Sequence, residues 1–168
     1  MADKYIRNLN GVLTEKAATT ESVGSANAGE IPALDPTGRI DQSMMPVGIG
    51  PDIAKIEADE NLAAGDFVNV FNDDGTAKVR KADASTAGKQ AHGYVLDSAT
   101  SGNLATVFFE GHNTSVTGAT PGTVFLGTTA GGFQATAPSS AGQIVQRLGV
   151  AIAPDDINFE RTLHFVLA

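Results

Sequence analysis

Short apolar stretches alternate with turn-forming residues at fairly regular spacing through residues 52–168. Runs rich in Val, Ile, Phe and Thr, separated by Gly, Asn, Asp and Ser, predict β-strands joined by short turns. A series of short strands with almost no helical periodicity predicts a small β-barrel or β-sandwich, so we expect a mainly β fold. The expected strands are Ile53–Ala58, Phe67–Phe71, Ala77–Lys81, His92–Asp97, Ala105–Glu110, Ser115–Thr117, Thr123–Leu126, Gly132–Thr136, Ile144–Ile152, Asp156–Phe159 and Leu163–Leu167.

Two of these strands carry more specific expectations. Phe67–Phe71 is followed by the turn sequence Asn72–Gly75 and then by the alternating run Ala77–Lys81. An Asp-Gly pair supplies the positive φ that a tight turn needs, so this stretch predicts a β-hairpin. Apolar and polar residues alternate poorly in Ala105–Phe109, which favours a strand with both faces buried.

Residues 1–51 have a different pattern, with small apolar islands among Gly, Pro, Ala, Thr and Ser. No stripe of 3.6-residue periodicity continues for more than about two turns, so we expect mostly extended chain. One short helix is predicted over Thr14–Thr19, where the residues have good helix propensity. A turn is predicted over Asp35–Gly38, because Pro fixes φ, Asp bonds back to the backbone and Gly tolerates the exit. We therefore expect an extended N-terminal arm, residues 1–51, attached to a β-body, residues 52–168.

An arm of this composition cannot bury its apolar islands against itself. It lies either on its own body or on a partner, and the exposed apolar residues favour a partner surface. The side chains that we expect to bind this partner are Ile31, Leu34, Arg39, Ile40, Met44, Met45 and Val47, with Arg39 in an ion pair.

Composition and charge exclude several classes of protein. The chain has 168 residues, which suits one domain, or one domain with an arm. Nineteen acidic and 11 basic residues give a net charge of −8, which argues against nucleic acid as a partner. The absence of cysteine excludes disulfides and thiolate sites. No apolar run is long enough for a membrane span or resembles a signal peptide, so we expect synthesis in a cytoplasm.

The sequence contains no motif of an enzyme, a metal site or a cofactor site. The three histidines lack zinc-site spacing, and Asn72–Gly75 lacks the alternating ligands of a calcium loop. No nucleophile elbow occurs, and Gly127–Gly132 lacks the Lys-Ser/Thr pair of a phosphate loop. Adjacent carboxylates fall at turn-like positions. All eight phenylalanines fall in the body, mostly within expected strands, which favours a core over a sugar-binding platform. We therefore predict a non-enzymatic protein.

Several segments resemble head-decoration, or cement, proteins of tailed bacteriophages. The resemblance rests on Gly29–Gly50 (GEIPALDPTGRIDQSMMPVGIG), Leu62–Val70, Val79–Asp83, Ala91–Val95 and Ile144–Ile152. It implies a β-rich body, usually a homotrimer, on the outer surface of the mature head. It also implies an arm that extends over adjacent major capsid protein subunits.

A decoration protein that binds the expanded lattice stabilises it by mass action. Cyclic symmetry lets one trimer engage three capsid subunits at once. The alternative function is a tail-fibre or baseplate component, because Gly29–Gly50 can also be an attachment module of such proteins. A carbohydrate-binding or carbohydrate-cleaving virion module is a third function, which predicts a cleft with carboxylates or stacked aromatic rings.

Overall fold

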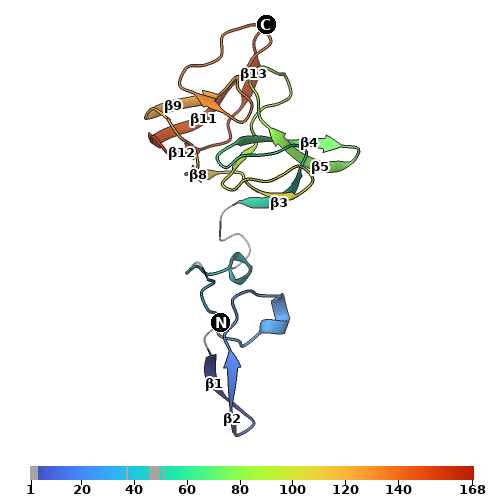
Figure 1. Cartoon of the computed structure of the whole chain (residues 1–168), viewed down its shortest axis with the longest axis vertical. Helices are drawn as coiled ribbons and strands as arrows, with labels where there is room; N and C mark the ends of the chain where they lie inside the picture. Colours follow the sequence, from blue (N-terminus) through green and yellow to red (C-terminus); the bar gives the residue numbers. More distant parts are fainter. Residues whose placement is uncertain (1–3, 37, 46–49, 51) are drawn as a thin grey trace. The chain divides into compact units, whose positions relative to one another are not determined.

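The computed structural model describes residues 4–36, 38–45, 50 and 52–168, and it is mainly β, as the sequence predicts. Its contacts divide the chain into two units, Met1–Gly50 and Pro51–Ala168. The strands of the second unit form a closed five-stranded barrel and a further sheet (Figure 1). Among the described residues, helical structure is limited to two 3-10 turns of the first unit, η1 (Gly24–Asn27) and η2 (Gln42–Met44).

The first unit begins with a hairpin in which β1 (Lys4–Leu9) pairs antiparallel with β2 (Val12–Ala17). Asn10 and Gly11 form its turn with φ of 53° and 86°, as is typical of an Asn-Gly pair. The prediction of a helix over Thr14–Thr19 is therefore wrong. So short a helix is unstable without tertiary support, and the Asn-Gly turn directs these residues into strand pairing instead.

The turn predicted over Asp35–Gly38 is confirmed by its hydrogen bonds. The Gly38 N–H donates to the Asp35 carbonyl oxygen at 2.9 Å, and the Asp35 N–H donates to the Arg39 carbonyl oxygen at 2.7 Å. The Asp35 carboxylate also accepts from the Arg39 N–H at 3.0 Å. Gly38 has a φ of 80°, which a residue with a side chain rarely adopts.

In spatial order the strands of the barrel in the second unit are β3 (Ile53–Ala58), β5 (Thr76–Lys81), β4 (Phe67–Asp73), β6 (Gly93–Val95) and β7 (Leu104–Phe108). β3 and β5 pair parallel, and the other four pairs that close the barrel are antiparallel. β4 and β5 form the predicted hairpin, with φ of 47° at Asp74 and 90° at Gly75. Small and branched side chains fill the barrel: Ala58, Leu62, Val68, Val79, Val95, Ala105 and Val107.

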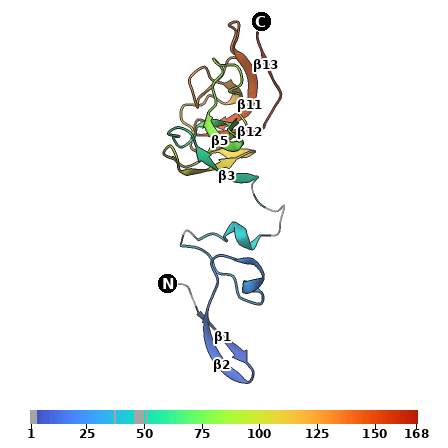
Figure 2. The same cartoon turned by 90° about the vertical axis from the view of Figure 1, so that its right-hand side faces the viewer.

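The second sheet of the body is antiparallel. In spatial order its strands are β10 (Phe133–Gln134), β9 (Gly122–Leu126), β11 (Ile144–Ala153), β12 (Asp156–Phe159) and β8 (Gly111–Asn113). A last strand, β13 (His164–Val166), pairs with the beginning of β11 and lies beside it in both views (Figures 1 and 2).

The strand predicted over Ser115–Thr117 is wrong, because the strand in this region is β8, which ends at Asn113. The Ser115 N–H donates to Asn113 Oδ1 at 3.3 Å, and the Ser115 hydroxyl donates to the Leu96 carbonyl oxygen at 3.0 Å. The Asn113 amide in turn donates to the Gly65 carbonyl oxygen at 2.9 Å. Side-chain bonds of this kind compete with a strand ladder and turn the chain.

A second core lies between the barrel and this sheet and is rich in aromatic rings. The buried ring of Phe67 in β4 lies 5.7 Å from that of Phe159 and 6.4 Å from that of Tyr94. Phe108 of β7 stacks on Tyr94 at 5.4 Å, while Val107 points into the barrel core. Burial nevertheless alternates along β7, because Ala105 and Val107 are buried whereas Leu104 is exposed and Phe108 is only partly buried. The prediction that both faces of this strand are buried is therefore confirmed for one face only.

Candidate interaction surface

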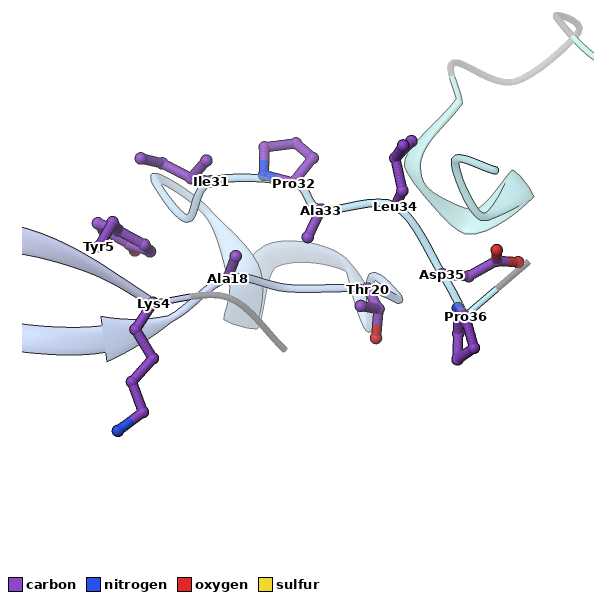
Figure 3. A pocket seen from close by; sticks show the side chains of 10 residues that line it. All are labelled: Lys4, Tyr5, Ala18, Thr20, Ile31, Pro32, Ala33, Leu34, Asp35 and Pro36. Carbon is purple, nitrogen blue, oxygen red and sulfur yellow. The ribbon is translucent and has the colours of Figure 1, made fainter. Parts of the chain in front are cut away.

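A groove of about 630 Å³ in the first unit lies between the start of the hairpin and residues 31–36 (Figure 3). The Thr19 N–H donates to the Ile31 carbonyl oxygen at 2.9 Å, and the Ala33 N–H donates to the Thr19 carbonyl oxygen at 2.8 Å. These two bonds hold residues 31–33 alongside residues 18–20 as a short parallel bridge. In Figure 3, Ala33 points toward residues 18–20, whereas Leu34 points away from them. The bridge thus presents neighbouring side chains on opposite sides.

The carboxylate of Glu30 fixes the segment that leads into this bridge. It accepts hydrogen bonds from Lys16 Nζ and the Thr19 hydroxyl, and from Asn27 Nδ2 at 3.0 Å. The bonds from Lys16 and then from Thr19 and Asn27 lower the pKa of Glu30 to about 2. The side chain of Glu30 is only 15% exposed. One ionised carboxylate therefore ties β2, η1 and the groove segment together.

No described side chain of the first unit is buried. Among all described residues, nine of the 14 exposed large hydrophobic side chains belong to this unit. Such a concentration of exposed apolar side chains is typical of an interaction surface. The unit is therefore held by turns, backbone bonds and polar contacts, and its apolar side chains are available to a partner.

The structure brings only some of the predicted binding residues together. Ile31 and Leu34 line the groove, and both are exposed. Met44 lines a smaller pocket of about 160 Å³ on the same bridge, beside Pro32 and Glu30. The remaining predicted residues line neither pocket, although Ile40, Met45 and Arg39 are exposed. Val47 lies outside the described residues.

Sequence reasoning missed the apolar residues of the hairpin. They are as exposed as the predicted set: Ile6, Leu9, Val12 and Leu13, the last at 73%. The signal that could have found them is the Asn10-Gly11 pair between two apolar islands, which is a strong short-range indicator of a hairpin. Leu9 and Val12 are opposite one another across the turn. Once paired, the two strands bring these side chains onto one small sheet.

Two polar atoms of β1 have no partner among the described residues. Tyr5 Oη and Arg7 Nε are both shielded from solvent, and neither makes a hydrogen bond. Alternate strand residues point to the same face, so both side chains lie on the face of the hairpin that carries Lys16. Buried polar atoms are normally paired. These two unpaired atoms therefore lower the stability of the hairpin.

The histidines and the acidic pairs of the body do not converge. Within the described part of the chain, no three His, Cys, Asp or Glu side chains are grouped so that they could hold a metal ion. His112 Nδ1 lies 3.0 Å from Asp156 Oδ1 at the surface. His92 accepts a hydrogen bond from the Val70 N–H at 3.0 Å, and burial is the main cause that lowers its pKa. Burial also raises the pKa of Tyr94 to about 12, which keeps this phenol protonated at neutral pH.

Comparison of the chain with protein-family models, with curated proteins and with solved structures finds no match. None of the helical segments in the described residues has the length and apolar character needed to span a membrane. The geometry therefore carries the functional argument together with the sequence resemblance.

Proposed function

We propose that the chain is a structural protein of a phage virion that binds the outside of the mature head through its first unit. There it bridges major capsid protein subunits and stabilises the expanded lattice. The observation that carries this proposal is the first unit itself, whose described residues include no buried side chain but nine exposed large hydrophobic ones. A unit of this kind needs a partner surface to remove its apolar side chains from water.

The apolar area is sufficient for stable attachment. Full burial of one Val, Leu, Ile or Met side chain contributes roughly 1.5–3 kcal/mol. Burial of half of the nine therefore gives on the order of 10 kcal/mol before the costs of association. Three copies in a cyclic trimer engage the lattice together, which raises the effective concentration of each further contact. The body, with its two cores, is a separately packed block.

The test is binding of the purified chain to expanded heads that lack it. We expect the double variant Ile31→Ser/Leu34→Ser to bind at least 100-fold more weakly, since two anchors are lost at roughly 1.5–3 kcal/mol each. Leu104→Ser is the matched control, because Leu104 is an equally exposed apolar residue, at 66%, on the barrel. Equal binding of both variants and the wild type would contradict the assignment of the first unit.

The place of the protein on the particle is tested by immunogold labelling of intact virions with an antibody against the body. Gold over the whole head surface supports a decoration protein that binds the major capsid protein. Gold confined to the tail favours the tail-fibre or baseplate function instead. Sedimentation of the free chain checks the expected homotrimer, since a monomer at all concentrations would contradict it.

A further inference from the structure

A pocket in the body lies where the segment before β6 meets the segment that leads into β13. Its volume is about 400 Å³. The polar and charged residues that line it are Gln90, His92, Gln146, Arg161, Thr162 and His164. This pocket is unrelated to the attachment surface of the first unit, and no step of the proposed function uses it.

The charge of this pocket is opposite to that of the chain. The protein has 19 acidic and 11 basic residues, yet an arginine and two histidines line the pocket and no carboxylate does. Among the described residues, Arg161 takes part in no salt bridge, whereas nearby Arg147 pairs with Glu160 at 3.7 Å. A concave site with charge of one sign concentrates small ions of the other sign.

The walls of the pocket are fixed by hydrogen bonds. The buried Gln146 amide donates to the Ala91 carbonyl oxygen at 2.8 Å and accepts from the Ala91 N–H at 2.7 Å. Gln146 Nε2 also donates to the Thr162 carbonyl oxygen at 3.4 Å. One side chain of β11 thereby positions the segment that carries His92 and the segment that carries Arg161.

Two neighbours fix the orientation of His92. Its Nδ1 accepts the Val70 N–H at 3.0 Å, so a neutral ring carries its proton on Nε2. Nε2 lies 3.2 Å from the amide of Gln90. Because Nε2 of His92 is the donor, the Gln90 amide satisfies it with its oxygen. The remaining side-chain donors of the pocket are therefore those of Arg161 and His164.

We propose that this pocket binds a small oxyanion, a carboxylate or phosphate group, between the guanidinium of Arg161 and the imidazoles of His92 and His164. Arginine offers planar, paired donors that match either group. The charged groups that act on His92 are Arg161 and His164, which both disfavour its protonation. A bound anion offsets these charges and favours the protonated form of His92, so by linkage anion binding strengthens as the pH falls.

The experiment follows the imidazole signals of the full chain by NMR during titration with inorganic phosphate and, separately, with acetate. It is performed at about pH 6 and about pH 8, on either side of the usual histidine pKa, at ionic strength held constant with sodium chloride. We expect saturable shifts of His92 and His164. Binding of acetate should be weaker at the higher pH, and only acetate tests this pH dependence, because phosphate itself gains negative charge between about pH 6 and about pH 8. His112 is the internal control, because it pairs with Asp156 outside the pocket. Saturation by one of the two anions alone identifies the preferred group and supports the site.

Arg161→Gln is expected to weaken binding about tenfold, the effect of losing one charge-assisted hydrogen bond. Arg147→Gln is the matched control and is expected to bind like the wild type, since Arg147 does not line the pocket. The signals of the buried Tyr94 ring verify that both variants are folded. Shifts that do not saturate, that are equal in His112, or that persist unchanged in Arg161→Gln would overturn the proposal.

Discussion

Gln146 is the residue whose replacement tests the structure of the body most directly. It is 1% exposed, and its amide forms the same pair of bonds with Ala91 that a neighbouring strand would form. Ala91 itself is fully buried. In Gln146→Leu the side chain keeps a similar volume, so the cavity contribution to the change in stability is small. The remaining effect of the substitution is that the buried N–H and C=O of Ala91 lose their hydrogen-bond partners.

The expected loss follows from these two groups. A buried donor or acceptor without a partner costs about 1–3 kcal/mol. The oxyanion pocket borders Gln146, so water can reach the site and solvate part of the exposed backbone. The lower half of the range therefore applies, and the free energy of unfolding should decrease by about 2–4 kcal/mol.

The assay is urea unfolding followed through NMR signals of the buried Tyr94 ring, with amide exchange of Ala91 as the local probe. The control is Gln143→Leu, because the Gln143 side chain only accepts the Ser140 N–H at 3.0 Å in an exposed turn. We expect the control to lie within about 0.5 kcal/mol of the wild type. If Gln146→Leu is equally stable and the Ala91 amide exchanges no faster, the amide bridge does not hold these segments together.

Three further predictions concern single residues. Gly149→Ala should destabilise the body by more than about 3 kcal/mol, because Gly149 has a φ of 139° and a Cβ would overlap the Asn158 carbonyl; an unchanged melting temperature would refute the close approach. The pKa of Glu30, about 2, lies below its ordinary value of 4.5, so the bonds around it are complete above about pH 5 and are lost as the pH falls toward 2; NMR of Thr19 should show this transition, and Glu30→Gln should abolish it. Burial lowers the pKa of His92 below 6.5, so its contribution to stability is present above that pH and is lost below it; His92→Asn, which keeps an acceptor, should flatten the pH dependence of urea unfolding, and an unaltered slope would refute it.

The strands of the body could largely be predicted because alternation and turn residues act locally. Ile53–Ala58 and Asp156–Phe159 coincide with β3 and β12, and Asp74-Gly75 adopts the positive φ that its sequence favours. Errors arose where a side chain replaced a backbone partner. Ser115 is compatible with a strand by propensity, but its bonds to Asn113 and Leu96 form a turn. The bond to Leu96 joins residues 19 apart in the sequence, so local propensity could not indicate it.

Both candidate pockets were beyond sequence reasoning for a different reason. The oxyanion pocket combines residues 90–92 with residues 161–164, and these meet only through the pairing of β11 with β13 and the bridge from Gln146. The groove of the first unit depends on the single bridge between Thr19 and Pro32. Composition indicated that exposed apolar residues are present, and the Asn10-Gly11 pair indicated a hairpin. Neither could indicate which of these residues lie side by side.

The described part of the first unit has a defined backbone but no buried side chain, and this combination constrains how it can bind. An isolated two-stranded hairpin is marginally stable in water, and the bonds of Glu30 are polar contacts that water can compete for. A partner that covers the exposed side chains of β1 and β2 supplies the apolar burial that the unit lacks, so binding and ordering of the unit are coupled. Attachment of this kind should have a large negative heat-capacity change and little dependence on salt, because it rests on apolar area. Attachment through Arg39 alone would show a small heat-capacity change and a strong dependence on salt. Calorimetry at two salt concentrations therefore distinguishes binding through the apolar residues from binding through Arg39.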